Sequence, residues 1–486
     1  MREPTLDYVD HAAIYSAALI FLFRVVGTTC PWIIAALSDK VCRRLIIYCG
    51  GLCFLRTHQT CLGMATHLGG ASHDALNRLL MEIATLLMTT CLFMATHLAT
   101  GGPCWLILDD VIIPKEYSKK RFAAYFDYDY VHDRHIRCLR VVVLCWTNGL
   151  VKIPVAFALW HKKGCVYLQE RGRRFRTKNE LARLLVWKVV RRGLSFDSLV
   201  FDSWYASAEN LILFRRLGIP FVGAVRFNRK FGLPSFPLSE APKRKRLRHP
   251  IWKTNRATDL AGGYPHSRDW AYYEAVHCRA RRWLIYLEEV PFPLSLVCIK
   301  NYARLKVFKE MVTPLEREQK DPNKYLVTAD VGLTTVQIIA RYRSRWAVEV
   351  LFRDCKQHLG LCAYQGQTVE AHVLHIACVF FSYVLMEHLK PLATSADKKA
   401  HTLTLGEAKA WLHRQVVVVE HRGNETVMVC QSLALPTEEE VEMMQTCLFE
   451  KRCAEDASED QMSPETASLH HHISQLPKFY ELKRCA

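Results

Sequence analysis

The stretch YRSRWAVEVLFRDCK, from Tyr342 to Lys356, carries four chemically demanding side chains at helical spacing. At ~100° per residue, Tyr342, Arg345, Glu349 and Lys356 fall within an arc of ~60°, so one continuous helix would point all four the same way. The alternative is a solvated helix face with an i,i+4 Arg–Glu ion pair. A carboxylate suited to a hard metal ion, flanked by groups that hold phosphate, instead predicts chemistry on a phosphodiester.

Two short apolar runs upstream carry further carboxylates. CWLILDDVIIP places Asp109 and Asp110 in the middle of a strand-like run, and SLVFDSWYAS places Asp202 at the end of another. A buried strand rarely carries a carboxylate pair without a partner for the charge, although an exposed strand edge would also explain the pair. We assign Asp110 as the first acid, with Asp109 as the alternative first ligand.

Three acids from separate elements, Asp110, Asp202 and Glu349, suit phosphodiester cleavage by metal ions. Two Mg²⁺ or Mn²⁺ ions ~4 Å apart activate a hydroxyl nucleophile and stabilise the leaving oxygen, and such ions prefer carboxylate oxygens. The sequence therefore predicts a site for two divalent ions.

The elements that must position these acids alternate between strand and helix signals in residues 101–230. Strands are predicted at 104–114, 121–131, 138–149 and 150–160, the last two as a hairpin turning at 147–149. A helix with a Thr cap and Glu180 at N3 follows at 177–192, then the strand ending at Asp202, a helix at 206–217 and a strand at 221–227. This order predicts an α/β, RNase H-like catalytic core whose acids lie at the carboxyl ends of strands.

The rest of the chain frames this core. We expect a helical N-terminal region in 1–100, a β-rich insertion in 231–321, and the second part of the core, with the glutamate helix and a following apolar helix, in 322–392. Residues 393–486 are expected to form a C-terminal helical region and an acidic tail.

The amino-acid composition and net charge limit the classes of partner that the protein can bind. Half of the 486 residues are hydrophobic, and Lys plus Arg exceed Asp plus Glu by 65 − 47 = 18, which predicts attraction to a polyanion. The apolar runs 12–23 and 86–99 are shorter than the ~20 residues that span a bilayer, so nucleic acid is favoured over a membrane. With no C-x2-C pair and no secretory leader, the 19 cysteines are expected to be free thiols in a reducing cytoplasm.

The pattern Y-x2-R-x3-E-x6-K is similar to the signature of DDE transposases of bacterial insertion sequences, of the IS4 type. LILDDVIIPK resembles the first-aspartate motif of that family, VFDSWYAS the second, and FVGAVRFNRKF the strand that follows. The resemblance covers roughly residues 100–390. The family commonly has Thr two residues after the first catalytic Asp, where counting from Asp110 gives Ile112; the acid itself is retained.

The resemblance implies a metal-binding triad of Asp110, Asp202 and Glu349, with Tyr342, Arg345 and Lys356 on the phosphates of the transposon end. It implies a dimer that cuts inverted-repeat ends in double-stranded DNA and transfers the 3′-OH to target DNA, with flanking DNA released through a hairpin. An aromatic side chain of the insertion would stack on a flipped base; the aromatic side chains there are Trp252, Trp270, Tyr272 and Trp283. A prokaryotic, nucleoid-associated protein of the cytoplasm is expected.

Basic segments outside the signature are further candidates for DNA contacts, although any one of them is equally well explained as a solvated loop. Residues 171–178 read RGRRFRTK and residues 243–249 read KRKRLRH. The individual candidates are Arg226, Lys230, Lys243, Arg244 and Lys245.

Two other functions share part of this pattern. A catalytically inactive, transposase-derived DNA-binding protein would keep the basic segments without needing the acids. A nuclease or resolvase on the same fold would need the acids but not the Tyr, Arg and Lys of the signature. All of these groups are present, which favours the transposase.

Overall fold

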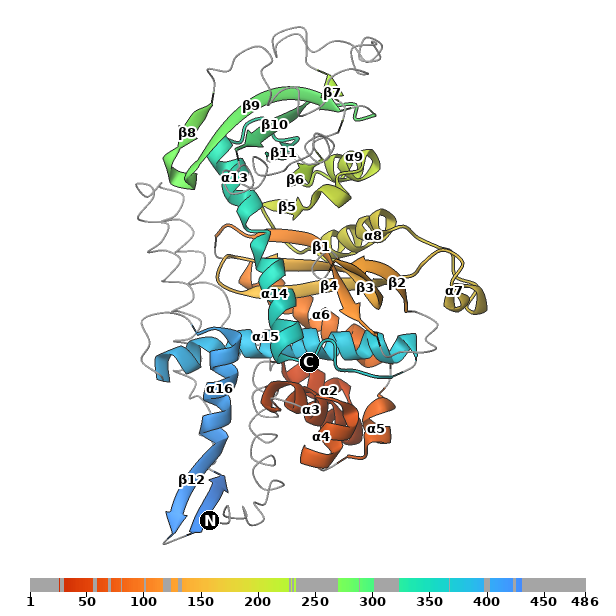
Figure 1. The fold of residues 1–486 in the computed structure, drawn as a ribbon, viewed down its shortest axis with the longest axis vertical. Helices are drawn as coiled ribbons and strands as arrows, with labels where there is room; N and C mark the ends of the chain where they lie inside the picture. The colour runs from red at the N-terminus through yellow and green to blue at the C-terminus, as the bar shows by residue number, and fades with distance from the viewer. Residues whose placement is uncertain are drawn as a thin grey trace, which may run out of the picture.

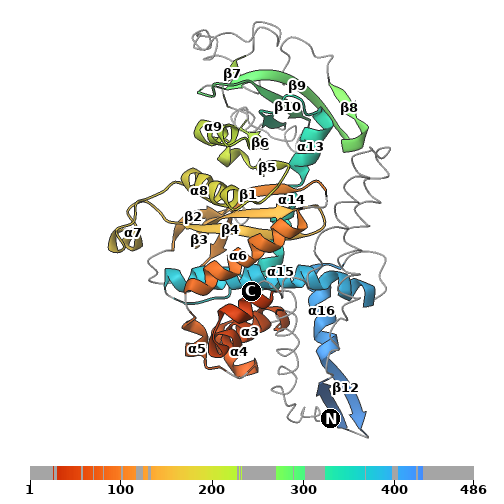
Figure 2. The same cartoon turned by 180° about the vertical axis from the view of Figure 1, so that it is seen from behind.

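A computed structural model gives the fold of the chain (Figures 1 and 2). It describes residues 26, 30–55, 59–68, 71–79, 81–99, 102–116, 124–129, 133–226, 229, 231–232, 270–287, 289–300, 323–366, 368–396, 403–422 and 425–430.

One mixed sheet of eleven strands runs through the described part of the chain, in the order β2-β3-β1-β5-β6-β11-β10-β9-β7, with β4 also paired to β3 and β8 to β9. Its strands are β1 (Trp105–Pro114), β2 (Tyr125–Asp129), β3 (Arg134–Thr147), β4 (Lys152–Trp160), β5 (Ser198–Phe201), β6 (Phe221–Val225), β7 (Phe231–Gly232), β8 (Ala271–Tyr273), β9 (Cys278–Leu287), β10 (Leu294–Ile299) and β11 (Lys324–Thr328).

Five neighbouring strands form the part of the sheet that positions the two predicted aspartate sites, on β1 and directly after β5. β1 runs antiparallel to β3 and parallel to β5, β3 pairs antiparallel with β4, and β5 pairs parallel with β6. The predicted β3–β4 hairpin is confirmed: Asn148 Oδ1 accepts hydrogen bonds from the backbone N–H groups of Leu150 and Val151, and Gly149 has φ +90°. That φ favours glycine, which has no Cβ to clash.

Helices cover both faces of these five strands. The helices of the described residues are α2 (Pro31–Ala36), α3 (Asp39–Phe54), α4 (Cys61–Leu68), α5 (His73–Asn77), α6 (Met81–Leu98), α7 (Val166–Glu170), α8 (Lys178–Arg191), α9 (Ala208–Arg216), α13 (Thr335–Arg343), α14 (Trp346–His358), α15 (Val369–Ala396) and α16 (Leu405–Val416). Figures 1 and 2 show α8 on one face and α6, α14 and α15 on the other.

The predicted cap of α8 is confirmed, because Thr177 and Glu180 form a capping box at its start. This cap satisfies two N–H groups that would otherwise have no partner at the beginning of the helix. It fixes the first residue of α8, Lys178, against the sheet.

The predicted β-rich segment contains strands, but they extend the core sheet. β11 pairs antiparallel with β6 on one side and with β10 on the other, so β8, β9 and β10 continue the same sheet. Residues 233–269 and 301–322, which make up much of the predicted insertion, lie outside the described residues.

The described N-terminal residues are helical. Ser72 caps α5 by accepting a hydrogen bond from Ala75, and α5 ends at Asn77, before α6 begins at Met81. The Asn77 side chain accepts hydrogen bonds from Cys61 and Tyr364. These contacts with α4 and the segment after α14 hold the chain at the break.

α15 is the long apolar helix expected near the end of the core. Its segment Val369–Lys390 is long and apolar enough to cross a membrane. In the most apolar 18-residue stretch of this helix, 83% is buried inside the protein. It packs between α3, α6 and β4, with Phe157 of β4 edge-on to Phe380. Burial of this kind is what a core helix shows.

The C-terminal region is not purely helical, which corrects the prediction for 393–486. α16 ends at Val416, and a hairpin of β12 (Val417–Arg422) and β13 (Glu425–Cys430) follows. Residues 416–419 are four consecutive valines, whose branched side chains disfavour a helix and suit a strand. The predicted acidic tail lies outside the described residues.

Candidate active site

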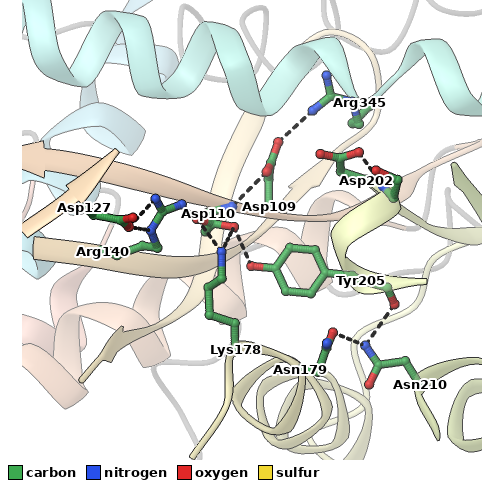
Figure 3. A network of polar contacts seen from close by, with 11 residues as sticks. Asp109, Asp110, Asp127, Arg140, Lys178, Asn179, Asp202, Tyr205, Asn210 and Arg345 are labelled. Atoms are coloured by element: carbon green, nitrogen blue, oxygen red, sulfur yellow. Dashed lines mark hydrogen bonds and ion pairs between the residues drawn. The ribbon is translucent and has the colours of Figure 1, made fainter. Parts of the chain in front are cut away.

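Asp109 and Asp110 are neighbours on β1 whose side chains point to opposite faces of the sheet (Figure 3). Successive residues of a strand alternate between faces, so only one of the two carboxylates can face α14. Asp109 Oδ2 lies 2.7 Å from Arg345 Nη1, whereas Asp110 accepts hydrogen bonds from Lys178 at the start of α8. The structure therefore brings the alternative first acid, Asp109, towards the glutamate helix.

Arg345 lies where the three acidic elements meet. Its guanidinium forms ion pairs with Asp109 of β1 and with Glu349 one turn further along α14. The side chains are 20% exposed for Arg345, 15% for Asp109 and 33% for Glu349, so water reaches the cluster only in part. Ion pairs with this degree of burial are screened less than surface pairs.

Asp202 is placed beside this cluster by the end of β5. It caps a short 3₁₀ turn, Ser203–Tyr205, by accepting a hydrogen bond from the Ser203 backbone N–H. Figure 3 shows its carboxylate next to Asp109 and below Arg345, and its charge acts on both. A strand end, a strand interior and a helix start thus supply one carboxylate each.

Burial and neighbouring charges change the pKa values of Asp109 and Arg345. Burial raises the pKa of the Asp109 carboxyl to about 7; Arg345 opposes this rise, and the charges of Asp110 and Asp202 add to it. Burial alone would lower the pKa of Arg345, but the acids around it raise that pKa above its ordinary value. Arg345 is therefore a permanent cation, and Asp109 exchanges its proton near neutral pH.

The signature stretch is two helices joined at Ser344-Arg345, where a single helix was predicted. Hydrogen bonds of the i→i−3 type run from Arg345 to Tyr342 and from Val348 to Arg345. The Ser344 hydroxyl also donates to the Arg341 carbonyl. Such short-range bonds compete with the regular helical ladder.

This break separates the four residues of the signature. Tyr342 ends up on α13, 6% exposed, with the Lys324 ammonium 4.6 Å from its ring centroid. Glu349 faces the cluster, and Lys356 is exposed near the end of α14. Arg345 and Glu349 are brought together with two aspartates; Tyr342 is near them but buried.

A second polar cluster lies behind the first, around Asp110. Its carboxylate lies 2.5 Å from Arg140 Nη1 and accepts a hydrogen bond of 2.9 Å from the Tyr205 hydroxyl, in addition to the contacts with Lys178. Arg140 in turn pairs with Asp127 of β2 (Figure 3). Because Tyr205 lies three residues after Asp202, this cluster ties β1 to the turn that holds Asp202.

Sequence reasoning missed most of this second cluster. A usable signal was present for Arg140, which stands inside the otherwise apolar run CLRVVVLCW and must therefore have a buried partner. Nothing in the sequence pattern indicates a buried partner for Lys178, which belongs to the basic segment 171–178, or for the Tyr205 hydroxyl.

The remaining predicted DNA contacts are only partly described. Arg226 is exposed directly after β6, with its guanidinium 5.3 Å from the ring centroid of Trp204. Lys230, Lys243, Arg244 and Lys245 lie outside the described residues, as does Trp252 of the predicted insertion.

Comparison with known protein families places these elements in context. Residues 34–281 match the family described as DDE superfamily endonuclease, a span that contains β1 with Asp109 and Asp110, and β5 with Asp202. The chain belongs to the DDE superfamily endonucleases. Its mixed α/β fold agrees with a nuclease of that kind, for which DNA is the expected substrate. A search of curated proteins finds no match to the chain.

Proposed function

We propose that this protein is a DNA transposase of the IS4 type, which cleaves DNA at transposon inverted-repeat ends and transfers the 3′-OH into target DNA. The observation that carries the proposal is the meeting of Asp109, Asp202 and Glu349 around Arg345. Three acids from three separate elements therefore lie close together, as the ligands of a two-metal phosphodiester site must.

The strand topology supports the RNase H-like part of the proposal. In the order β4-β3-β1-β5-β6, the first three strands are antiparallel neighbours, and β5 and β6 run parallel to β1. Parallel strands place their carboxyl ends at one edge of the sheet, where sites in open α/β sheets form. Asp202 follows β5 and Arg226 follows β6 at that edge.

The donor set fits divalent metal ions. Within the described residues, no three acid, His or Cys side chains already surround one metal position, because the Arg345 guanidinium lies between Asp109 and Glu349. Yet the acids are hard oxygen donors of the kind that divalent ions prefer, and burial, with the charges of Asp110 and Asp202 adding to it, raises the pKa of Asp109 to about 7. Asp109, Asp202 and Glu349 would hold Mg²⁺ or Mn²⁺, two ions per site by family resemblance.

Bound ions would supply charge neutralisation for the attacking and leaving oxygens. The chain's own groups then have separate tasks. Asp109, Asp202 and Glu349 would hold the ions, which would require Arg345 to release Asp109 and Glu349. A released Arg345, which is always charged, is suited to a bidentate contact with a DNA phosphate. Lys356, exposed further along α14, adds a second phosphate contact from the same helix.

Partners follow from charge and family. The formal net charge of +18 attracts DNA without sequence preference, and the site selects a phosphodiester within it. Action on two ends by a homodimer, and a cytoplasmic, nucleoid-associated location, rest on the family resemblance alone.

A catalytically inactive DNA-binding protein of the same descent is the second candidate. It is favoured by one observation: Arg345 already forms ion pairs with two of the three acids, Asp109 and Glu349.

Cleavage of a labelled duplex carrying one inverted-repeat end distinguishes the two candidates. With Mg²⁺, we expect a nick at the end of the repeat, loss of cleavage in Glu349→Gln, and undiminished binding of the duplex by that variant. Glu209→Gln, a change at an exposed glutamate of α9, is the matched control and should cleave normally. Binding without cleavage by the unaltered protein would support the inactive candidate and overturn the transposase.

A further inference from the structure

Trp204 is an exposed tryptophan held rigidly beside the candidate acid Asp202. It is 46% exposed and lies in the 3₁₀ turn that Asp202 caps. The next residue, Tyr205, is buried, and its hydroxyl donates to Asp110 while its carbonyl accepts a hydrogen bond of 2.9 Å from Asn210. These hydrogen bonds hold both ends of the turn, which places Trp204 two residues after Asp202 at the acid cluster.

Two cations from different elements lie against the Trp204 ring. Lys178 Nζ is 4.1 Å from the ring centroid, and the Arg226 guanidinium is 5.3 Å away. Lys178 is only 11% exposed and binds Asp110, so it contacts the ring from the protein interior. Arg226 is exposed at the carboxyl end of β6. The indole thus contacts one buried cation, Lys178, and one exposed cation, Arg226.

Another exposed tryptophan shows what an ordinary surface pair looks like. Trp187 is 40% exposed and stacks with Arg191, one helical turn along α8, at 4.8 Å. That pair is local to one helix and uses a single cation. Trp204 differs because its cations come from α8 and from the end of β6, and because a candidate catalytic acid is two residues away.

We propose that Trp204 is a stacking surface for an unpaired nucleobase of the DNA strand bound at the acid cluster, with Arg226 on the adjacent phosphate. This inference rests on the proposed function, since it requires DNA at Asp109, Asp202 and Glu349. A base in a duplex already has its faces covered by neighbours, so a single exposed indole selects a base that has left the stack. Every base has a π face, so stacking of this kind is tolerant of sequence.

Charge complementarity identifies the occupant as nucleic acid. A nucleotide joins an aromatic face to an anionic phosphate, and this edge of the sheet offers an indole beside Arg226, with Arg229 close by in the chain. An aromatic ligand without a phosphate would leave the cation unused.

The test measures binding of a short duplex with a single-stranded thymidine tail, and of the same duplex with abasic residues in the tail. The unaltered protein should prefer the thymidine tail roughly tenfold, the scale of base–aromatic stacking. Trp204→Leu keeps an apolar cover over Lys178 but has no π face, so it should lose the preference. Trp204→Phe should retain most of it, and Trp187→Leu should retain all of it.

Each other result has a defined meaning. Equal affinity of the unaltered protein for both tails, or a preserved preference in Trp204→Leu, overturns the stacking role while leaving DNA binding intact. Failure of the unaltered protein to bind either duplex contradicts the proposed function, and the stacking role with it. Thermal unfolding of each variant, expected near that of the unaltered chain, shows that the fold is kept.

Discussion

The Arg345 Nη1 atom lies 2.7 Å from Asp109 Oδ2, an ion pair between residues 236 positions apart in the chain. It joins the middle of β1 to the start of α14, and through Glu349 it draws the third acid to the same place. The candidate active site is thus assembled around a cation that the protein itself supplies.

The pKa of Asp109 predicts a pH-dependent stability. Because the folded-state pKa, about 7, is above the ordinary value of 3.8, the folded protein binds this proton more tightly than the unfolded chain. The stability from this group is therefore complete below about pH 4 and is lost as the pH rises through 7. Asp109→Asn should gain stability over the unaltered protein at pH 8 and show little gain at pH 4.

Urea unfolding in the presence of a metal chelator measures this difference. Asp74→Asn, a change at a residue whose side chain is 63% exposed, is the control and should show no such pH trend. An equal effect of Asp109→Asn at both pH values would contradict the buried, crowded environment assigned to this carboxyl.

Tyr205→Phe should destabilise the fold by ~1–2 kcal/mol, because a buried hydrogen bond to a charged group is lost. Arg140 and Lys178 still neutralise Asp110, so the loss stays moderate. Tyr383→Phe is the matched control, since the buried Tyr383 hydroxyl has no hydrogen-bond partner among the described residues. Equal free energies of unfolding for the two variants would remove the role given to the Tyr205 hydroxyl.

Lys409 of α16 should contribute strongly to stability from a position far from the acids. Its ammonium donates hydrogen bonds of 2.6–2.9 Å to the carbonyls of Leu52, Leu55 and His358, at the ends of α3 and α14. A buried cation there neutralises two helix C-termini. Lys409→Met should cost ~2–3 kcal/mol of unfolding free energy. The change Lys188→Met, at an exposed residue of α8, should cost less than ~0.5 kcal/mol; similar costs would refute this role.

The two outer residues of the signature should differ in DNA binding. Lys356 is exposed, so Lys356→Ala should weaken binding of a duplex and lower the slope of log affinity against log salt by ~1. Tyr342 is buried, so Tyr342→Phe should leave that affinity unchanged. A fluorescence-anisotropy titration at several salt concentrations checks both. A loss caused by Tyr342→Phe as large as that of Lys356→Ala would contradict the buried position.

The sequence predicted the order of elements around the acids, because strand and helix periods, turn residues and the Thr177 cap are local signals. The sequence assignment of Asp110 as the first acid differs from the structure, in which Asp109 meets Arg345. The choice depends on which face of β1 meets α14, and that is a long-range property. The spacing of Tyr342, Arg345, Glu349 and Lys356 did not predict the break at Ser344, because that spacing was read as one regular helix. The partners of Arg140 also depend on long-range pairing, because Asp110 comes from β1 and Asp127 from β2.

The face of β1 that each aspartate occupies is the central claim, and cleavage by Asp109→Asn and Asp110→Asn tests it most directly. With a duplex carrying the inverted-repeat end and Mg²⁺, Asp109→Asn should lose at least ~10³-fold in cleavage rate while still binding the duplex. Asp110→Asn should lose no more than ~10²-fold, as expected of a residue that acts through its neighbours. Undiminished cleavage by Asp109→Asn, with activity abolished in Asp110→Asn, would contradict the site described above.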